Sequence, residues 1–415
     1  MRAVDELLSR LSPQGVQFVE LKDLFEVRNG YTPSKSDPSL WIGGDVPWFR
    51  MEDIRQNGRR LSEAIQKIPH AAVKGGRLFP ANAILVATSA TIGEHALVSV
   101  PHLSNQRFTS LSLKPDWVGL LDMEFVFYYC FKLSDWCLRN TTTSSFASVD
   151  MQGFRRFRFP IPPMEVQRQI VRVLDQFTEL EAELEAELEA RRLQYAHYRN
   201  SLFDLRGVTE VDWIPLGDAG VFFGGLSGKT KSDFTDGNAF FVSYVNVLNN
   251  ISVDLQREDR VRIETDERQR ELRRGDIIFT GSSETPLEVG MSSVMTEHPT
   301  RPTYLNSFCI GYRLNRPELL EPEFAKHLFR SQIMRDQIVQ TAAGVTRYNI
   351  SKGRLAKVLF PVTSRDQQLR IAATLDKFDA LVNDLSVGLP AELAARRKQY
   401  EYYRDKLLTF EEAPA

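Results

Sequence analysis

With 415 residues, the chain is long enough for two domains of ordinary size, each with its own hydrophobic core. Apolar residues make up 42% and charged residues 26% of the sequence, which is the composition of a globular protein rather than of a disordered or membrane protein. The net charge of −2 excludes a polycation that binds nucleic acid by bulk attraction, although basic clusters such as 268–274 could still meet phosphates locally.

The first predicted element is a short helix within residues 1–14, with Leu7, Leu8 and Leu11 on one face and Pro13 at its end. This segment matches the tail of a helix in the middle of the chain. We therefore expect it to complete the end of the C-terminal helix, so that the two chain ends lie close together. The N-terminal sequence has no apolar signal-like run and no segment is long enough to span a bilayer, so we expect a cytoplasmic location.

Residues 15–159 and 207–360 are predicted to form two domains of the same plan. Each contains short β-branched and aromatic runs separated by Gly, Pro, Asn and Asp, which are typical of strands joined by turns. Each also has one helical pattern, at 122–140 in the first domain and at 323–339 in the second. The fold class is therefore α+β, with two mixed and mainly antiparallel domains.

Each domain is followed by a predicted long helix, at 160–206 and at 361–410. The two helical sequences are copies of each other: Gln167 matches Gln368 and Phe177 matches Phe378 when the segments are superimposed. Internal repetition of this length indicates a duplicated architecture. The second helix contains Gly388 and Pro390, which should kink or break it.

Heptad spacing places an apolar seam on each long helix, and such a seam needs a partner helix. We predict an antiparallel coiled-coil pair within one chain, which gives an internal pseudo-two-fold repeat; homodimerisation through a simple coiled coil is the alternative. The residues predicted to pair the helices are Ile170, Leu174, Phe177, Leu184, Leu188, Tyr195, Tyr198, Ile371, Leu375, Phe378, Tyr400 and Tyr403.

The catalytic motifs that the chain could carry fail on inspection. The segment GGLSGKT at 224–230 resembles a phosphate-binding loop, but the required spacing needs glycine where Phe223 stands. The histidines are scattered without metal-ligand spacing, so we expect no catalytic residues and no metal site. The three cysteines form no CxxC pair and are expected to be reduced.

The domains offer instead loops that are rich in Ser, Thr, Asn, Gln, Lys and Arg beside aromatic residues, a set that suits base-edge and phosphate contacts together. For any single member a turn or a strand cap is the simpler explanation. The candidate DNA-binding residues of the first domain are Thr32, Ser34, Lys35, Trp48, Arg50, Thr88, Ser89, Thr91, Asn105, Gln106 and Arg107. Those of the second domain are Ser227, Lys229, Thr230, Lys231, Tyr244, Asn246, Ser282, Ser283, Asn306, Ser307, Arg347 and Tyr348.

At this point the sequence resembles the DNA-specificity subunits of type I restriction-modification enzymes. The motifs that carry the resemblance are those at 29–54, 89–98, 225–247 and 342–351, together with the helix starts PIPPMEVQRQI and PVTSRDQQLRI. The second helix start keeps the glutamine and the isoleucine but loses the second proline pair. The order of domain, helix, domain, helix covers nearly the whole chain.

The resemblance implies two target recognition domains, each reading one half of a bipartite DNA sequence, and helices that separate them and dock two methyltransferase subunits. It further implies that S-adenosylmethionine and the adenine chemistry belong to those partners, that restriction subunits complete the nuclease, and that this chain is a non-catalytic DNA-binding protein. A coiled-coil adaptor without DNA binding and a solitary DNA-modification or cleavage enzyme remain alternatives. Three Glu-Leu-Glu-Ala units at 179–190 are expected to set the spacer between the half-sites.

Overall fold

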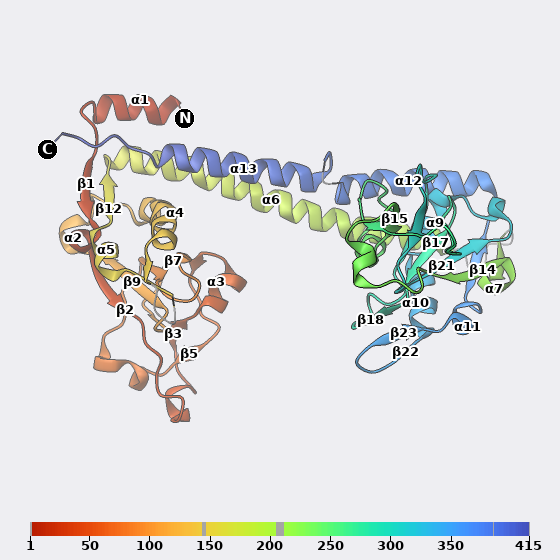
Figure 1. Cartoon of the computed structure of the whole chain (residues 1–415). Coiled ribbons are helices and arrows are strands. Elements are labelled where there is room, and N and C mark those ends of the chain that lie inside the picture. Colours follow the sequence, from red (N-terminus) through yellow and green to blue (C-terminus); the bar gives the residue numbers. More distant parts are fainter. Residues whose placement is uncertain (1, 143–146, 205–210, 385, 415) are drawn as a thin grey trace. The chain divides into compact units, whose positions relative to one another are not determined.

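A computed structural model describes residues 2–142, 147–204, 211–384 and 386–414. The chain divides into two compact units, residues 1–183 with 394–415 and residues 184–393 (Figure 1). Helices α6 (Met164–Phe203) and α13 (Leu389–Leu407) contribute to both units. The order of domain, helix, domain, helix that the sequence predicts is therefore present, and the α+β class is confirmed.

The described residues of unit 1 form five further α-helices and twelve strands. Its helices are α1 (Arg2–Leu11), α2 (Leu21–Leu24), α3 (Met51–Asn57), α4 (Met123–Arg139) and α5 (Met151–Arg156). Its strands are β1 (Gln17–Glu20), β2 (Phe25–Asn29), β3 (Val46–Phe49), β4 (Arg60–Leu61), β5 (Lys67–Ile68), β6 (Ala83–Ala87), β7 (His95–Val98), β8 (Leu103–Ser104), β9 (Phe108–Leu113), β10 (Thr141–Thr142), β11 (Ser148–Val149) and β12 (Arg158–Ile161).

Unit 2 follows the same order. Its helices are α7 (Leu216–Ala219), α8 (Tyr244–Asn249), α9 (Pro322–Leu328), α10 (Gln332–Gln340), α11 (Lys352–Leu355) and α12 (Arg365–Asn383). Its strands are β13 (Asp212–Pro215), β14 (Gly220–Gly224), β15 (Ala239–Val242), β16 (Arg260–Val261), β17 (Ile277–Thr280), β18 (Ser282–Ser283), β19 (Ser292–Val294), β20 (Thr303–Leu305), β21 (Cys309–Leu314), β22 (Ala342–Ala343), β23 (Tyr348–Ile350) and β24 (Leu359–Val362).

The strand pairing repeats from one unit to the other. The central sheet of unit 1 has the order β2-β9-β6-β7-β4, and that of unit 2 has the order β14-β21-β17-β19. In each unit the strand that enters the domain pairs antiparallel with the strand that leaves it, β1 with β12 and β13 with β24. Most pairs are antiparallel, and the parallel pairs include β3 with β8 and β15 with β20. These matching registers confirm the internal repeat.

The predicted helix at 323–339 is corrected by the structure, which has two helices there, α9 and α10. Helix α9 ends at Leu328, and Ser331, whose extended backbone has φ −69° and ψ 155°, caps the start of α10. Between the two helices, the side chain of Arg330 donates hydrogen bonds to the carbonyl oxygens of Ser292, Val247 and Asn250. A buried guanidinium in this position needs such acceptors.

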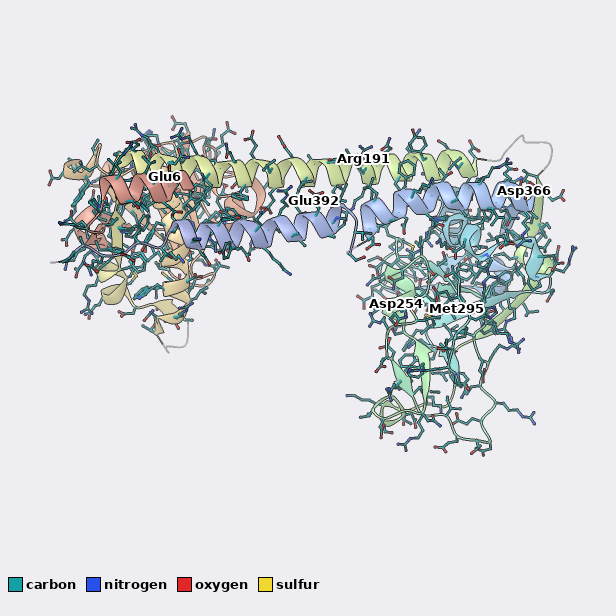
Figure 2. All side chains as sticks on the ribbon, turned by 90° about the horizontal axis from the view of Figure 1, so that it is seen from above. Glu6, Arg191, Asp254, Met295, Asp366 and Glu392 are labelled. Carbon is teal, nitrogen blue, oxygen red and sulfur yellow. The ribbon has the colours of Figure 1, made fainter. Side chains whose placement is uncertain are left out.

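The C-terminal helical region is also divided, as the glycine and the proline predict. Helix α12 ends at Asn383 and α13 begins at Leu389. A turn separates them, in which Asp384 Oδ1 accepts hydrogen bonds from the backbone N–H of Ser386 at 2.7 Å and from its hydroxyl at 2.6 Å. Figure 2, in which Asp366 marks the first turn of α12, shows this interruption.

The prediction that the N-terminal segment completes the C-terminal helix is wrong, although the chain ends do meet. The C-terminal segment after α13 lies beside the residue that precedes β1: Val16 N donates to Glu411 O at 2.8 Å and Ala413 N donates to Val16 O at 3.0 Å. Helix α1 is a separate element on which Val4 is buried, and Arg10 donates to Glu165 at the start of α6. In Figure 2, Glu6 marks α1 beside α6.

Candidate nucleic-acid interface

Each domain is attached to the long helices by a buried glutamine that occupies the same place in the repeat. Gln167 donates to Leu120 O and Pro162 O and accepts from the backbone N–H of Asp122. Gln368 makes the matching bonds to Leu319 O and Thr363 O and accepts from Glu321. Because an amide has two donors and an acceptor, glutamine satisfies all three backbone groups at once. The internal repeat superimposes these two glutamines, but we predicted no role for them from the sequence.

An aspartate about two turns further along each helix accepts hydrogen bonds from its own domain. Asp175 accepts from Tyr128 at 2.6 Å and from Arg60 at 2.6 Å. Asp376 accepts from His327 at 2.7 Å and from Lys326 at 2.8 Å. Burial alone would raise the pKa of Asp376, but the bonds from His327 and Lys326 lower it below its usual value.

The aromatic residues predicted to pair the helices meet crosswise. In unit 1, Phe177 of α6 lies 6.3 Å from Tyr400 and 5.4 Å from Tyr403 of α13, between ring centroids. In unit 2, Phe378 of α12 lies 6.5 Å from Tyr195 and 5.2 Å from Tyr198 of α6. In each unit, therefore, the N-terminal part of one long helical segment packs against the C-terminal part of the other.

The aliphatic residues predicted to pair the helices also serve the domain cores. Ile170 and Leu174 lie in the hydrophobic core of unit 1. Within unit 2, the hydrophobic core includes or is packed by Leu184, Leu188, Ile371 and Leu375. The seam of the predicted coiled coil is thus shared between helix packing and domain packing.

In unit 1 the predicted loops leave the central sheet at one edge. Asn29 at the end of β2 pairs with Thr109, and Ala87 at the end of β6 pairs with Phe108, the first residue of β9. The segments that follow β2 and β6 therefore meet the turn 105–107, which precedes β9. Gly30 permits this approach, since a Cβ there would stand 2.1 Å from Asn105 O.

Unit 2 repeats this edge. Gly224 at the end of β14 pairs with Ile310, and Thr280 at the end of β17 pairs with Cys309. A Cβ on Gly225 would stand 2.0 Å from Asn306 O, so this glycine matches Gly30. We call the two edges, with the turns 105–107 and 306–308, the loop edges of units 1 and 2.

The two turns share one backbone hydrogen-bonding pattern, but the exposed side chain at their third position differs. Asn105 Oδ1 accepts from Arg107 N at 3.1 Å, and Asn306 Oδ1 accepts from Phe308 N at 2.8 Å. The asparagine closes the turn in both units, whereas the third residue is an exposed arginine in unit 1 and an exposed phenylalanine in unit 2. Phe308 was not among the candidates, although superimposing Asn105-Gln106-Arg107 on Asn306-Ser307-Phe308 would have found it.

Several candidates of unit 1 have structural roles. Trp48 is 4% exposed and donates to Tyr31 O at 3.0 Å, so its ring is part of the core and is not free to stack on a base. Thr88 is buried and shares a hydrogen bond with Thr109. The guanidinium of Arg50 lies over the Trp48 ring, 5.6 Å from its centroid.

The remaining candidates of unit 1 lie in its loops. Thr32 bonds to Gln106 across the loop edge, and Ser89 forms an isolated bridge with Ser148. Thr91 is half-buried, while Ser34, Lys35 and Arg107 are exposed.

In unit 2, the candidates Lys229 and Thr230 make contacts within the domain. The side chain of Lys229 is 5% exposed, and its ammonium forms a salt bridge with Glu267 at 2.5 Å. Thr230 caps the start of a short 3-10 helix, where its hydroxyl donates a hydrogen bond to Asp233 at 2.8 Å. Asn246 is 2% exposed and exchanges hydrogen bonds with the backbone of Asp254. Ser227, Lys231 and Ser307 are exposed.

Four other candidates of unit 2, Tyr244, Ser282, Ser283 and Arg347, line a cavity of about 350 Å³ at its loop edge, whereas Tyr348 packs against the hydrophobic core. Tyr244 Oη donates to Ser282 O at 3.0 Å, and Ser283 Oγ donates to Glu288 at 3.0 Å. The strand β23, which starts at Tyr348, pairs with β18 and so brings Arg347 over the cavity. The lining residues are Tyr244, Ser282, Ser283, Glu284, Glu288, Phe308 and Arg347.

A pair of matching hollows lies where each domain joins its helix ends. One, of about 700 Å³, includes Trp213 of β13 and Asn200 of α6; the other, of about 600 Å³, includes Phe18 of β1 and Thr409 after α13. Trp213 pairs with Pro361 and Phe18 pairs with Pro160, so the two aromatic residues occupy the same place in the repeat.

Among the described residues, no group of three or more His, Cys, Asp or Glu side chains is placed to hold a metal ion. No described helix is long and apolar enough to cross a membrane.

Comparison with known proteins agrees with this duplicated fold. Residues 13–190 match the family model described as type I restriction modification DNA specificity domain. The chain is 54% identical over 202 residues to the type I restriction enzyme EcoprrI specificity subunit of Escherichia coli, a match that covers 46% of this chain and 50% of that protein. It is 28% identical over 293 residues to the EcoR124I/EcoR124II specificity subunit of Escherichia coli, covering 65% of this chain and 69% of the relative.

Solved structures share the fold at low sequence identity. A chain from a study of complex assembly and conformational transition of the type I R-M system aligns with a TM-score of 0.67 at 17% identity, covering 95% of this chain and 98% of that one. The HsdS subunit from Thermoanaerobacter tengcongensis aligns with a TM-score of 0.52 at 17% identity, covering 96% and 97%. The resemblance read from the sequence is thus confirmed: residues 13–190 match the family model of the type I restriction modification DNA specificity domain, and the chain is similar to specificity subunits of type I restriction enzymes.

Proposed function

We propose that this chain is the non-catalytic, sequence-specific DNA-binding subunit of a type I restriction-modification complex, in which each unit reads one half of a bipartite target. The observation that carries the proposal is the contrast between a repeated frame and differing loop edges. The frame keeps Gln167 with Gln368 and Asn105 with Asn306, whereas the exposed positions differ, as Arg107 and Phe308 do. Two domains that share one fold but expose different loop residues suit an asymmetric DNA target with two different half-sites.

The chemistry of the loop edges supports DNA as the ligand. Exposed arginine and lysine suit phosphate and guanine, and hydroxyls and aromatic rings suit base edges and thymine methyl groups. Because the whole chain carries a net charge of −2, we expect the isolated protein to bind DNA modestly and in a salt-sensitive way. Tight binding then depends on partners that close around the duplex.

We further propose that two identical methyltransferase subunits dock on the repeated helix surfaces, and that restriction subunits join them. The matching hollows beside Phe18 and Trp213 support two equivalent contacts, because a repeated surface presents the same shape twice. S-adenosylmethionine and the adenine chemistry belong to these partners in this proposal. A coiled-coil adaptor without DNA binding is the rival function.

The test is to express the chain with its methyltransferase subunit and to map methylated adenines by long-read sequencing. A bipartite motif that appears only when this chain is present supports the proposal. Methylation that does not depend on the chain, or a complex that forms without any DNA preference, would leave only the adaptor. The chain alone, incubated with labelled random duplexes, serves as the comparison for binding without the partner.

A further inference from the structure

Among the described residues that line the cavity at the loop edge of unit 2, Arg347 is a cation with N–H donors still available. The hydroxyl of Tyr244 and the hydroxyl of Ser283 already donate within the site, to Ser282 O and to Glu288. Arg347 donates one hydrogen bond, to Ser282 Oγ at 3.1 Å. A guanidinium has five N–H donors in a planar fork, so most of this fork remains for a ligand.

Two contacts hold the Arg347 fork in place. Its guanidinium lies 5.8 Å from the centroid of the Phe308 ring, and the bond to Ser282 fixes its other side. The backbone next to Arg347 is also fixed, because the following strand β23 pairs with both β22 and β18. An arginine stacked on a ring loses less side-chain entropy when it binds than a free surface arginine does.

The charges around the cavity favour a base edge over a phosphate. Glu284 and Glu288 line the same cavity and are exposed. Two carboxylates repel a phosphate group, but they can accept a hydrogen bond from cytosine N4. The O6 and N7 atoms of guanine are the major-groove partners that a planar arginine fork binds through two parallel bonds.

We infer that Arg347 reads a guanine in the half-site recognised by unit 2, with Phe308 holding the guanidinium in the reading position. This inference rests on the proposed function and adds to it a specificity residue and the base that the residue recognises. Lysine cannot replace Arg347 here, because an ammonium lacks the planar fork and does not stack in the same way.

The test compares the wild-type complex with the Arg347→Lys and Arg347→Ala variants, each assembled with the methyltransferase subunit. Binding is measured on duplexes in which each position of the mapped target is changed in turn. We expect discrimination to fall about 10- to 100-fold at one guanine of one half-site, while the other half-site keeps its full preference. Phe308→Ala should weaken the same position to a smaller extent.

Arg316→Ala is the matched control, because Arg316 is an exposed arginine of unit 2 that pairs with Glu318 and does not line the cavity. Thermal unfolding of each variant shows whether it folds. A uniform loss of affinity for all sequences, with a shallower salt dependence, would make Arg347 a phosphate contact and overturn the inference while leaving the proposed function intact. An unchanged motif, or a half-site without guanine, would also overturn it. A wild-type complex without sequence preference would instead refute the proposed function itself.

Discussion

Deleting Glu183–Ala186 tests whether α6 sets the distance between the two half-sites. Helix α6 is uninterrupted from Met164 to Phe203. The deletion therefore removes about 6 Å of rise and about 400° of rotation, a net turn of about 40°. One base pair of DNA contributes about 3.4 Å and about 35°. We expect the non-specific spacer to shorten by one base pair, with both half-sites unchanged.

The rotation matches one base pair closely, whereas the rise exceeds it by about 3 Å. The C-terminal helical region can accommodate the change, because it is already divided between the end of α12 at Asn383 and the start of α13 at Leu389. The turn built on Asp384 can alter its path there without unwinding a helix. A helix pair that is tilted relative to the DNA axis would absorb the remaining difference in rise.

The assay is methylation mapping of the complex that contains the deletion variant. Inserting a fourth Glu-Leu-Glu-Ala unit should lengthen the spacer by one base pair. Deleting only Leu184–Ala186 changes the rotation by about 300° and should abolish methylation, because it turns one end of the helix out of register by about 60°. An unchanged spacer after the four-residue deletion would refute the reasoning.

Further predictions concern the frame and the surface charge. Replacing Gln167 by alanine removes the partner of three backbone groups and should lower the free energy of unfolding by about 2–4 kcal/mol, with faster hydrogen exchange in unit 1 only. Gln368→Ala should do the same in unit 2, and equal effects on both units would contradict this. Burial lowers the pKa of His95 to about 3, below its unfolded value, so the stability that His95 contributes above about pH 6.5 should be lost as the pH falls toward 3. Unfolding titrations at several pH values should show a weaker acid destabilisation for His95→Gln, and an unaltered profile would exclude His95 as its source. The DNA affinity of the isolated chain should fall steeply with salt; salt-resistant tight binding in a filter assay would contradict the expectation drawn from its net charge.

The repeat was readable from the sequence because its frame residues are buried or hydrogen-bonded and keep their spacing. Gln167 and Gln368 satisfy three backbone groups each, and Phe177 and Phe378 face tyrosine pairs. The glycine and proline near residue 388 likewise predicted a break, since their backbone preferences are local. Fold class, duplication and helix pairing therefore followed from pattern alone.

The roles of individual loop residues were decided by contacts between distant segments. Lys229 reads as a phosphate contact until Glu267 is placed beside it, and Trp48 reads as a stacking ring until Tyr31 accepts its N–H. Phe308 gains a role only when Arg347 lies over it.

Sequence by itself thus determined the duplicated α+β architecture, because periodicity and burial are properties of each segment. Only the tertiary structure decided which polar side chains remain available to a ligand. Hydrogen bonds and ion pairs between strands far apart in the chain occupy some donors, such as the Lys229 ammonium, and leave others free, such as most of the Arg347 guanidinium.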